Sequence, residues 1–137
     1  MVAPPEFWQG IAEFNQQQFY ACHDTLEAIW IEAPESDKKF YQGILQVAVG
    51  CYHLSNGNWR GAVILLGEGV RRLCEYLPSH YDVNVQLLLE QSNQLLQTLQ
   101  HIKPEQAEAF FQQLQNPDDG DRDLIQGCQI PYIVTVN

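Results

Sequence analysis

The chain has 137 residues, and its 17 acidic and 7 basic side chains give a formal net charge of −10. This balance argues against sequence-independent binding of nucleic acid and against binding to anionic lipid, because both need clustered lysine and arginine. No segment approaches the ~18 consecutive apolar residues of a membrane span, and the first residues lack the basic and apolar regions of a secretion signal. We therefore expect a cytoplasmic, acidic protein with one domain over residues 1–137 and no membrane contact.

Apolar residues recur every three or four positions along most of the chain, which predicts helices. Prolines and short turns rich in asparagine and glycine separate them. We expect Ser36 to cap the third helix and Asp82 the fifth, because their side-chain oxygens can accept from the free amides of the first turn. The predicted helices cover residues 5–17, 19–32, 37–55, 58–76, 83–100 and 104–115.

The end of the chain differs in composition from the helices. Residues 130–136 are apolar and β-branched, which suits an extended segment laid on the helices, whereas the acidic stretch 117–123 is expected to be a loop. No internal repeat or low-complexity linker interrupts the pattern. The sequence thus predicts an all-α fold, a compact single-domain bundle of five to six helices with an extended C-terminal tail.

The basic side chains are unevenly distributed. Four of the seven lie at the start of the third predicted helix and the end of the fourth, namely Lys38, Lys39, Arg71 and Arg72. An antiparallel hairpin of these two helices would gather them into one basic patch, which would suit a small anion or an acidic partner. The alternative for Lys39 and Arg72 is pairing with a glutamate four residues earlier in the same helix.

The second predicted helix carries the main candidate for chemistry. His23 and Glu27 lie one turn apart, so a ring nitrogen and a carboxylate oxygen can point to the same place. Imidazole and carboxylate suit a divalent transition metal such as zinc, iron or manganese. Asp24 could add an oxygen or orient these groups, and Trp30 continues the same stripe.

The third predicted helix supplies a second line of polar side chains, Gln42, Gln46 and His53. Gly43 and Gly50 flank this line and would let another backbone approach closely. If the preceding helix packs on this face, the two lines form one polar cluster. Two ligands from one helix are too few for stable zinc, so further ligands would have to come from Asp24, His53 or another helix.

These residues carry a resemblance to a known family. The segments concerned are 19–30, 40–48 and 57–62. They resemble the family called domain of unknown function 309, whose hallmark His-x-x-x-Glu-x-x-Trp is matched by His23, Glu27 and Trp30. The resemblance covers about residues 7–77, and residues 80–137 match no family that we can name. It implies an all-helical bacterial or archaeal protein without an established activity, whose motif is suspected of binding metal; members usually carry glutamate where Asp24 stands.

Two function classes stay open at this point. In the first, the polar cluster binds a divalent metal or a small ligand and could activate water for hydrolysis, with Glu27 or Asp24 removing the proton. In the second, the protein is a non-catalytic helical interaction module, and the same cluster is a buried hydrogen-bond network. A protein partner or a homodimer would then meet the exposed aromatic residues. No substrate follows from the sequence.

Overall fold

Helices account for most of the residues that the computed structural model describes, which are 3–116 and 127–136. The acidic segment predicted as a loop, 117–123, lies outside them. This part of the chain forms six α-helices, so the predicted all-α class is confirmed. Their bounds are α1 Pro5–Asn15, α2 Phe19–Glu32, α3 Glu35–Ser55, α4 Trp59–Leu73, α5 Val85–Leu99 and α6 Ala107–Gln115, with the 3₁₀ turns η1 Cys74–Tyr76 and η2 Pro104–Gln106. None of the described helices is both long and apolar enough to cross a membrane.

Helix α3 starts earlier than the sequence predicted. Pro34 is extended, and its carbonyl accepts from the backbone amides of Asp37 and Lys38 at 2.9 and 3.1 Å. The first helical residue is therefore Glu35, since proline sets the helix entry at once. Ser36 lies inside the first turn, and its predicted role as a cap is wrong.

A short β-hairpin, which the sequence did not predict, separates α4 from α5. Its strands are β1 Ser79–His80 and β2 Val83–Asn84, joined by Tyr81 and Asp82, whose φ angles are 47° and 64°. Two positive φ angles in a two-residue turn match the twist of the flanking strands. The predicted capping role of Asp82 is consequently wrong, and Asn84 accepts from the Leu87 amide at 3.0 Å instead.

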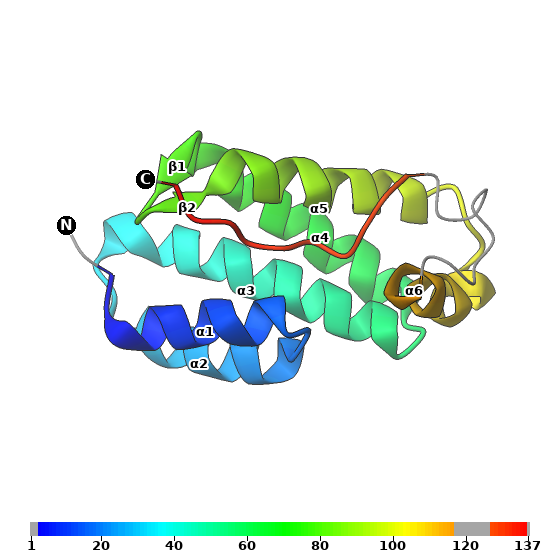
Figure 1. Cartoon of the computed structure of the whole chain (residues 1–137), viewed down its shortest axis with the longest axis horizontal. Coiled ribbons are helices and arrows are strands. Elements are labelled where there is room, and N and C mark those ends of the chain that lie inside the picture. The colour runs from blue at the N-terminus through cyan, green and yellow to red at the C-terminus, as the bar shows by residue number, and fades with distance from the viewer. Residues whose placement is uncertain (1–2, 117–126, 137) are drawn as a thin grey trace.

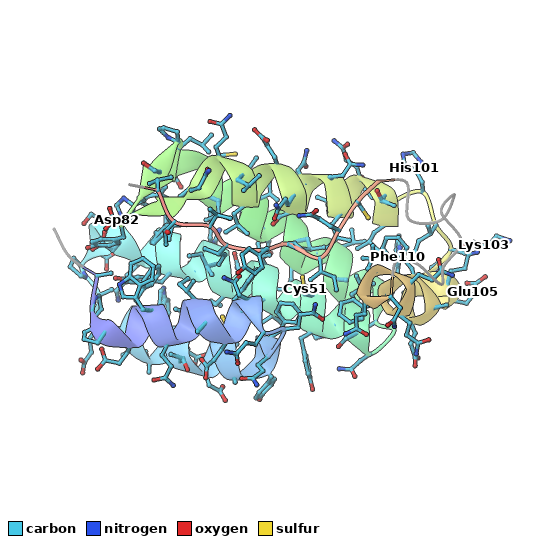
Figure 2. The ribbon with its side chains drawn as sticks, viewed as in Figure 1. Cys51, Asp82, His101, Lys103, Glu105 and Phe110 are labelled. Atoms are coloured by element: carbon cyan, nitrogen blue, oxygen red, sulfur yellow. The ribbon has the colours of Figure 1, made fainter. Side chains whose placement is uncertain are left out.

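Helix α3 is the central element of the bundle. Helices α1 and α2 lie on one side of it, and α4 and α5 lie on the other (Figure 1). The backbones of α3 and α4 come very close, because a Cβ added to Gly50 would lie 2.9 Å from Leu66 Cγ and one added to Gly69 only 2.9 Å from the Gly43 carbonyl. Cys51, which follows Gly50, is fully buried in the interior (Figure 2). The close approach expected from the glycines of this helix is thus confirmed, with α4 as the partner.

The described part of the C-terminal tail, residues 127–136, runs extended along the bundle as predicted (Figure 1). The Asn15 side-chain amide donates to the Ile133 carbonyl at 2.9 Å and accepts from the Ile133 amide at 2.8 Å. Further along, the Asn84 amide donates to the Val134 carbonyl at 2.8 Å. The tail is therefore hydrogen-bonded both to the end of α1 and to strand β2.

Candidate functional site

The His23 side chain lies between two carboxylates on the surface of α2. Its Nε2 is 2.9 Å from Glu27 Oε2, and its Nδ1 is 3.3 Å from Asp24 Oδ1. The side chains of Glu27 and Asp24 are 49% and 65% exposed, and that of His23 is 24% exposed. The motif thus forms a surface group rather than a buried network.

The other predicted members of the polar cluster have different neighbours. Gln46 is buried on α3, and its Nε2 donates to Glu68 Oε2 of α4 at 3.0 Å, so it faces α4 rather than the motif helix. Gln42 is partly buried on the same helix. Trp30 packs against the core, and the Lys38 ammonium lies 5.3 Å from the centre of its ring.

The fourth predicted metal ligand, His53, belongs to the last turn of α3. Its Nδ1 is 3.3 Å from Asn58 Nδ2, and its ring lies against Gly61. Within residues 3–116 and 127–136, no group of three or more histidine, cysteine, aspartate or glutamate side chains could hold a metal ion. The pair of His23 and Glu27 offers two donor atoms, fewer than the four ligands of a structural zinc site.

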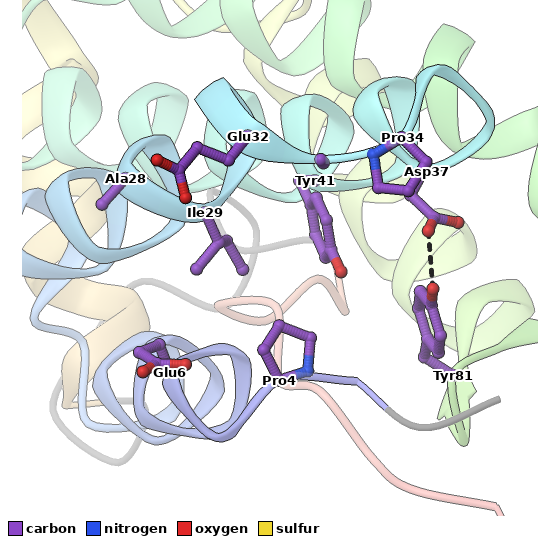
Figure 3. Close-up of a pocket in the computed structure, with 10 residues that line it drawn as sticks. Pro4, Glu6, Ala28, Ile29, Glu32, Pro34, Asp37, Tyr41 and Tyr81 are labelled. Carbon is purple, nitrogen blue, oxygen red and sulfur yellow. Dashed lines mark hydrogen bonds between the residues drawn. The ribbon is translucent and has the colours of Figure 1, made fainter.

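A second candidate site, which the sequence did not suggest, lies between α1, α2, α3 and the β-hairpin. It is a pocket of about 480 Å³, called the Asp37 pocket here (Figure 3). None of the residues proposed from the sequence lines it. The lining residues are Pro4, Glu6, Ala28, Ile29, Glu32, Ala33, Pro34, Asp37, Tyr41 and Tyr81.

Asp37 is the buried polar residue of this pocket, with 4% of its surface exposed. The Tyr81 hydroxyl donates to its Oδ2 at 2.6 Å (Figure 3), and His80 Nε2 lies 3.1 Å from its Oδ1. A buried carboxylate is costly unless it is paired and hydrogen-bonded, and both of its oxygens have a partner here. The pocket therefore contains a fixed carboxylate at its inner wall.

Aromatic rings pack around this carboxylate and its partners. The rings of Tyr41 and Tyr81 are nearly parallel, with 4° between their planes and 6.4 Å between their centres. His80 meets Phe40 edge-on at 4.6 Å and lies 4.8 Å from Tyr76. This packing accounts for the left-handed backbone at Tyr81, a conformation that a bulky residue rarely adopts and that persists only where the surroundings fix it.

The tyrosine hydroxyls of the pocket are held in the neutral form. Burial is the main cause that raises the pKa of Tyr81, and its hydrogen bond to Asp37 raises the pKa further. Burial also raises the pKa of Tyr41, and the nearby charge of Asp37 adds to this effect. An ionised tyrosine would lose hydration and face a carboxylate, so both effects favour the neutral hydroxyl. Tyr81 can therefore keep donating to Asp37 well into the alkaline range.

The charged groups that line the Asp37 pocket all have the same sign. Glu6 comes from the first turn of α1, Glu32 from the last turn of α2 and Asp37 from the first turn of α3. No lysine or arginine is among the lining residues. A pocket walled by one sign of charge concentrates ligands of the opposite sign. The arrangement can therefore bind a positively charged group.

The amino-acid sequence contains only part of the information that would predict the Asp37 pocket. Asp37 and Tyr41 are one turn apart in α3, but Tyr81 and His80 follow more than 40 residues after Asp37, in a hairpin that the sequence did not predict. His80 follows a proline-containing turn and gives no sequence signal for the site, but in the structure it packs against Phe40 and contacts Asp37. Only the fold brings these groups together.

Fold and site define a helical protein with an acidic, aromatic pocket at one end of its bundle. Residues 7–65 match the family described as domain of unknown function 309, so the resemblance to that family is confirmed over this part of the chain. The chain is also similar to the uncharacterized protein YpuF of Bacillus subtilis (strain 168), with 32% identity over 72 residues. The match covers 51% of this chain but only 41% of YpuF. No solved structure matches the chain significantly.

Proposed function

We propose that the chain is a ligand-binding protein and that the Asp37 pocket holds a small organic cation. The observation that carries the proposal is the charge of the lining: three carboxylates and no basic side chain around about 480 Å³. This volume falls within the range of roughly 300–1,000 Å³ that is typical of small-molecule sites. A neutral or anionic ligand of the same size would not gain from this lining.

The remaining lining residues restrict the ligand further. The rings of Tyr41 and Tyr81 offer faces that attract an ammonium or guanidinium group. Ile29 and the two prolines Pro4 and Pro34 supply an apolar surface for a short hydrocarbon body. Because the pocket contains both kinds of surface, we expect an amine that carries a small apolar or aromatic group.

The test uses three probes of equal size and different charge: benzylammonium, benzyl alcohol and benzoate. Each is titrated into ¹⁵N,¹³C-labelled protein, and the resonances of Ala28, Ile29 and Tyr41 are followed by NMR. We expect saturable shifts with benzylammonium, weaker shifts with benzyl alcohol and none with benzoate. Equal binding of the three probes, or shifts confined to residues outside the pocket, would overturn the proposal.

A second candidate function is a divalent-metal site on α2, supported by the convergence of His23 Nε2 and Glu27 Oε2 at 2.9 Å. Both side chains are accessible, so water or a group from another molecule would have to complete the ligand set. Elemental analysis of natively purified protein tests this candidate. Near-stoichiometric zinc, iron or manganese that His23→Ala removes would support it, and metal-free protein with an unchanged fold would contradict it.

A further inference from the structure

A second pocket of about 300 Å³ lies where the first turns of α3 meet the end of α4 and η1. Its lining consists of Lys39, Arg71, Arg72 and Glu75, and it is called the basic pocket here. It shares no lining residue with the Asp37 pocket. Three of the chain's 7 basic side chains thus converge on one pocket of a molecule whose net charge is −10.

The close contact between α3 and α4 brings these side chains together. A Cβ added to Gly43 would lie 3.0 Å from Leu73 Cγ and 3.4 Å from Arg72 Cβ. Lys39 lies one turn before Gly43 in α3, so its side chain meets the arginines that end α4. The sequence predicted that an antiparallel hairpin would bring four basic residues together. Three of them, Lys39, Arg71 and Arg72, line this pocket.

Two carboxylates lie near these cations, but they neutralise them only in part. Glu68, one turn before Arg72 and the partner that spacing predicts for it, accepts from Gln46 at 3.0 Å. Lys39 lies 3.6 Å from Glu75, a contact in which both side chains are more than half exposed. Neither arginine forms a salt bridge with a residue that the structure describes.

Arg72 also carries a buried donor without an acceptor. Its Nε is shielded from solvent and has no hydrogen-bond partner among the described groups. An unsatisfied buried donor is costly, more so when it is charged, so its presence calls for an explanation. An oxyanion in the basic pocket would satisfy this guanidinium if the Arg72 side chain turned toward it.

We propose that the basic pocket binds a small molecule through a phosphate group. Three cations and one carboxylate give the lining a net charge of +2, which matches the charge of about −1.5 to −2 that a phosphate monoester carries near pH 7. The guanidinium fork of arginine matches the spacing of phosphate oxygens, and the guanidinium groups of Arg71 and Arg72 would supply the donors. Glu75 faces the same space and would weaken the binding of any anion.

Isothermal titration calorimetry with phenyl phosphate tests this site, with phenyl sulfate as the monoanionic comparison. We expect the phosphate to bind more tightly than the sulfate. Arg72→Gln should weaken phosphate binding about tenfold, as expected for one lost charge-assisted hydrogen bond. Arg60→Gln is the matched control, because Arg60 is an exposed arginine of the same helix that does not line the pocket, and its variant should bind like the wild type.

Glu75→Gln provides a test of opposite sign, since removal of the competing carboxylate should tighten phosphate binding. It also keeps the proposal testable if Arg72→Gln does not fold. Equal affinity of the Arg72 and Arg60 variants, no effect of Glu75→Gln, or no binding of phenyl phosphate would overturn the proposal. So would binding to phosphatidate vesicles without binding to the soluble phosphate. The basic pocket can fail these tests without affecting the Asp37 pocket.

Discussion

Two of the contacts between histidine and carboxylate among the described residues differ in origin and environment. His23 and Glu27 lie four residues apart on one helix, 2.9 Å from each other, and Glu27 is 49% exposed. His80 and Asp37 are 3.1 Å apart and 43 residues distant in sequence, and the Asp37 side chain is only 5% exposed. The first follows from helical spacing alone, whereas the second exists only because the β-hairpin folds back onto α3.

Burial decides how much each contact contributes. Exposed ion pairs typically contribute about 0–1 kcal/mol to stability, because water already solvates both groups. Removing one member of a buried group costs more, since its former partners stay buried without their bonds. The comparison therefore indicates that Asp37 organises the pocket and that the more recognisable motif has the weaker structural role.

The largest effect should come from breaking the buried contact. Asp37→Ala removes the acceptor of Tyr81 and the neighbour of His80, so we expect the free energy of unfolding to fall by about 3 kcal/mol. Urea denaturation followed by circular dichroism measures this change. Glu27→Ala is the matched control on the surface contact, and an equal loss in both variants would contradict the comparison.

Removing only the hydrogen bond between Tyr81 and Asp37 should lower the free energy of unfolding by a smaller amount. Tyr81→Phe keeps the aromatic packing but removes the 2.6 Å bond to Asp37, and we expect a loss of about 1–2 kcal/mol. Tyr132→Phe serves as the control, because Tyr132 is 51% exposed. If both variants unfold at the same urea concentration as the wild type, the hydroxyl of Tyr81 does not support the pocket.

Alkaline pH should gradually lower the contribution of Tyr81 and Asp37 to the free energy of unfolding. Burial and Asp37 raise the pKa of Tyr81 in the folded protein, so the folded state keeps a proton that the unfolded state loses above its ordinary pKa of about 10. This contribution to stability is fully present below about pH 10 and declines as the pH rises further. Unfolding measured from pH 8 to 11 should show this decline, and Tyr81→Phe should make it shallower. An identical slope in the variant would speak against the protected hydroxyl.

The smallest effect is expected at the surface contact. Glu27→Gln should change the free energy of unfolding by less than about 0.5 kcal/mol, because its partner His23 stays in contact with Asp24 and with water. Thermal unfolding at low and high salt measures the difference. A loss above 2 kcal/mol would show that the motif is a structural network after all.

The sequence predicted the helices well because their apolar period is local. It placed α2 at residues 19–32, as observed, and it anticipated that the glycines of α3 allow a close backbone approach. It missed the β-hairpin, since a turn through Tyr81 and Asp82 lacks the glycine or asparagine that usually marks two positive φ angles. The incorrect capping role of Asp82 has the same cause.

The candidate site was less predictable than the fold. Spacing along one helix identifies pairs such as His23 and Glu27, but it gives no information about burial. The environment of Asp37 depends on Tyr81 and His80, whose proximity results from tertiary contacts. The charge of the pocket likewise depends on Glu6 and Glu32, which belong to different helices and have no shared pattern in the sequence.

The most direct test of the Asp37 pocket compares two glutamates of the same helix. Glu32 lines the pocket, whereas Glu27 contacts His23 outside it, and both are exposed. We predict that Glu32→Gln weakens benzylammonium binding about fivefold, the effect of one lost charge of roughly 1 kcal/mol, and that Glu27→Gln leaves it unchanged. Equal affinities in the two variants, or a loss only in Glu27→Gln, would contradict a cation site at Asp37.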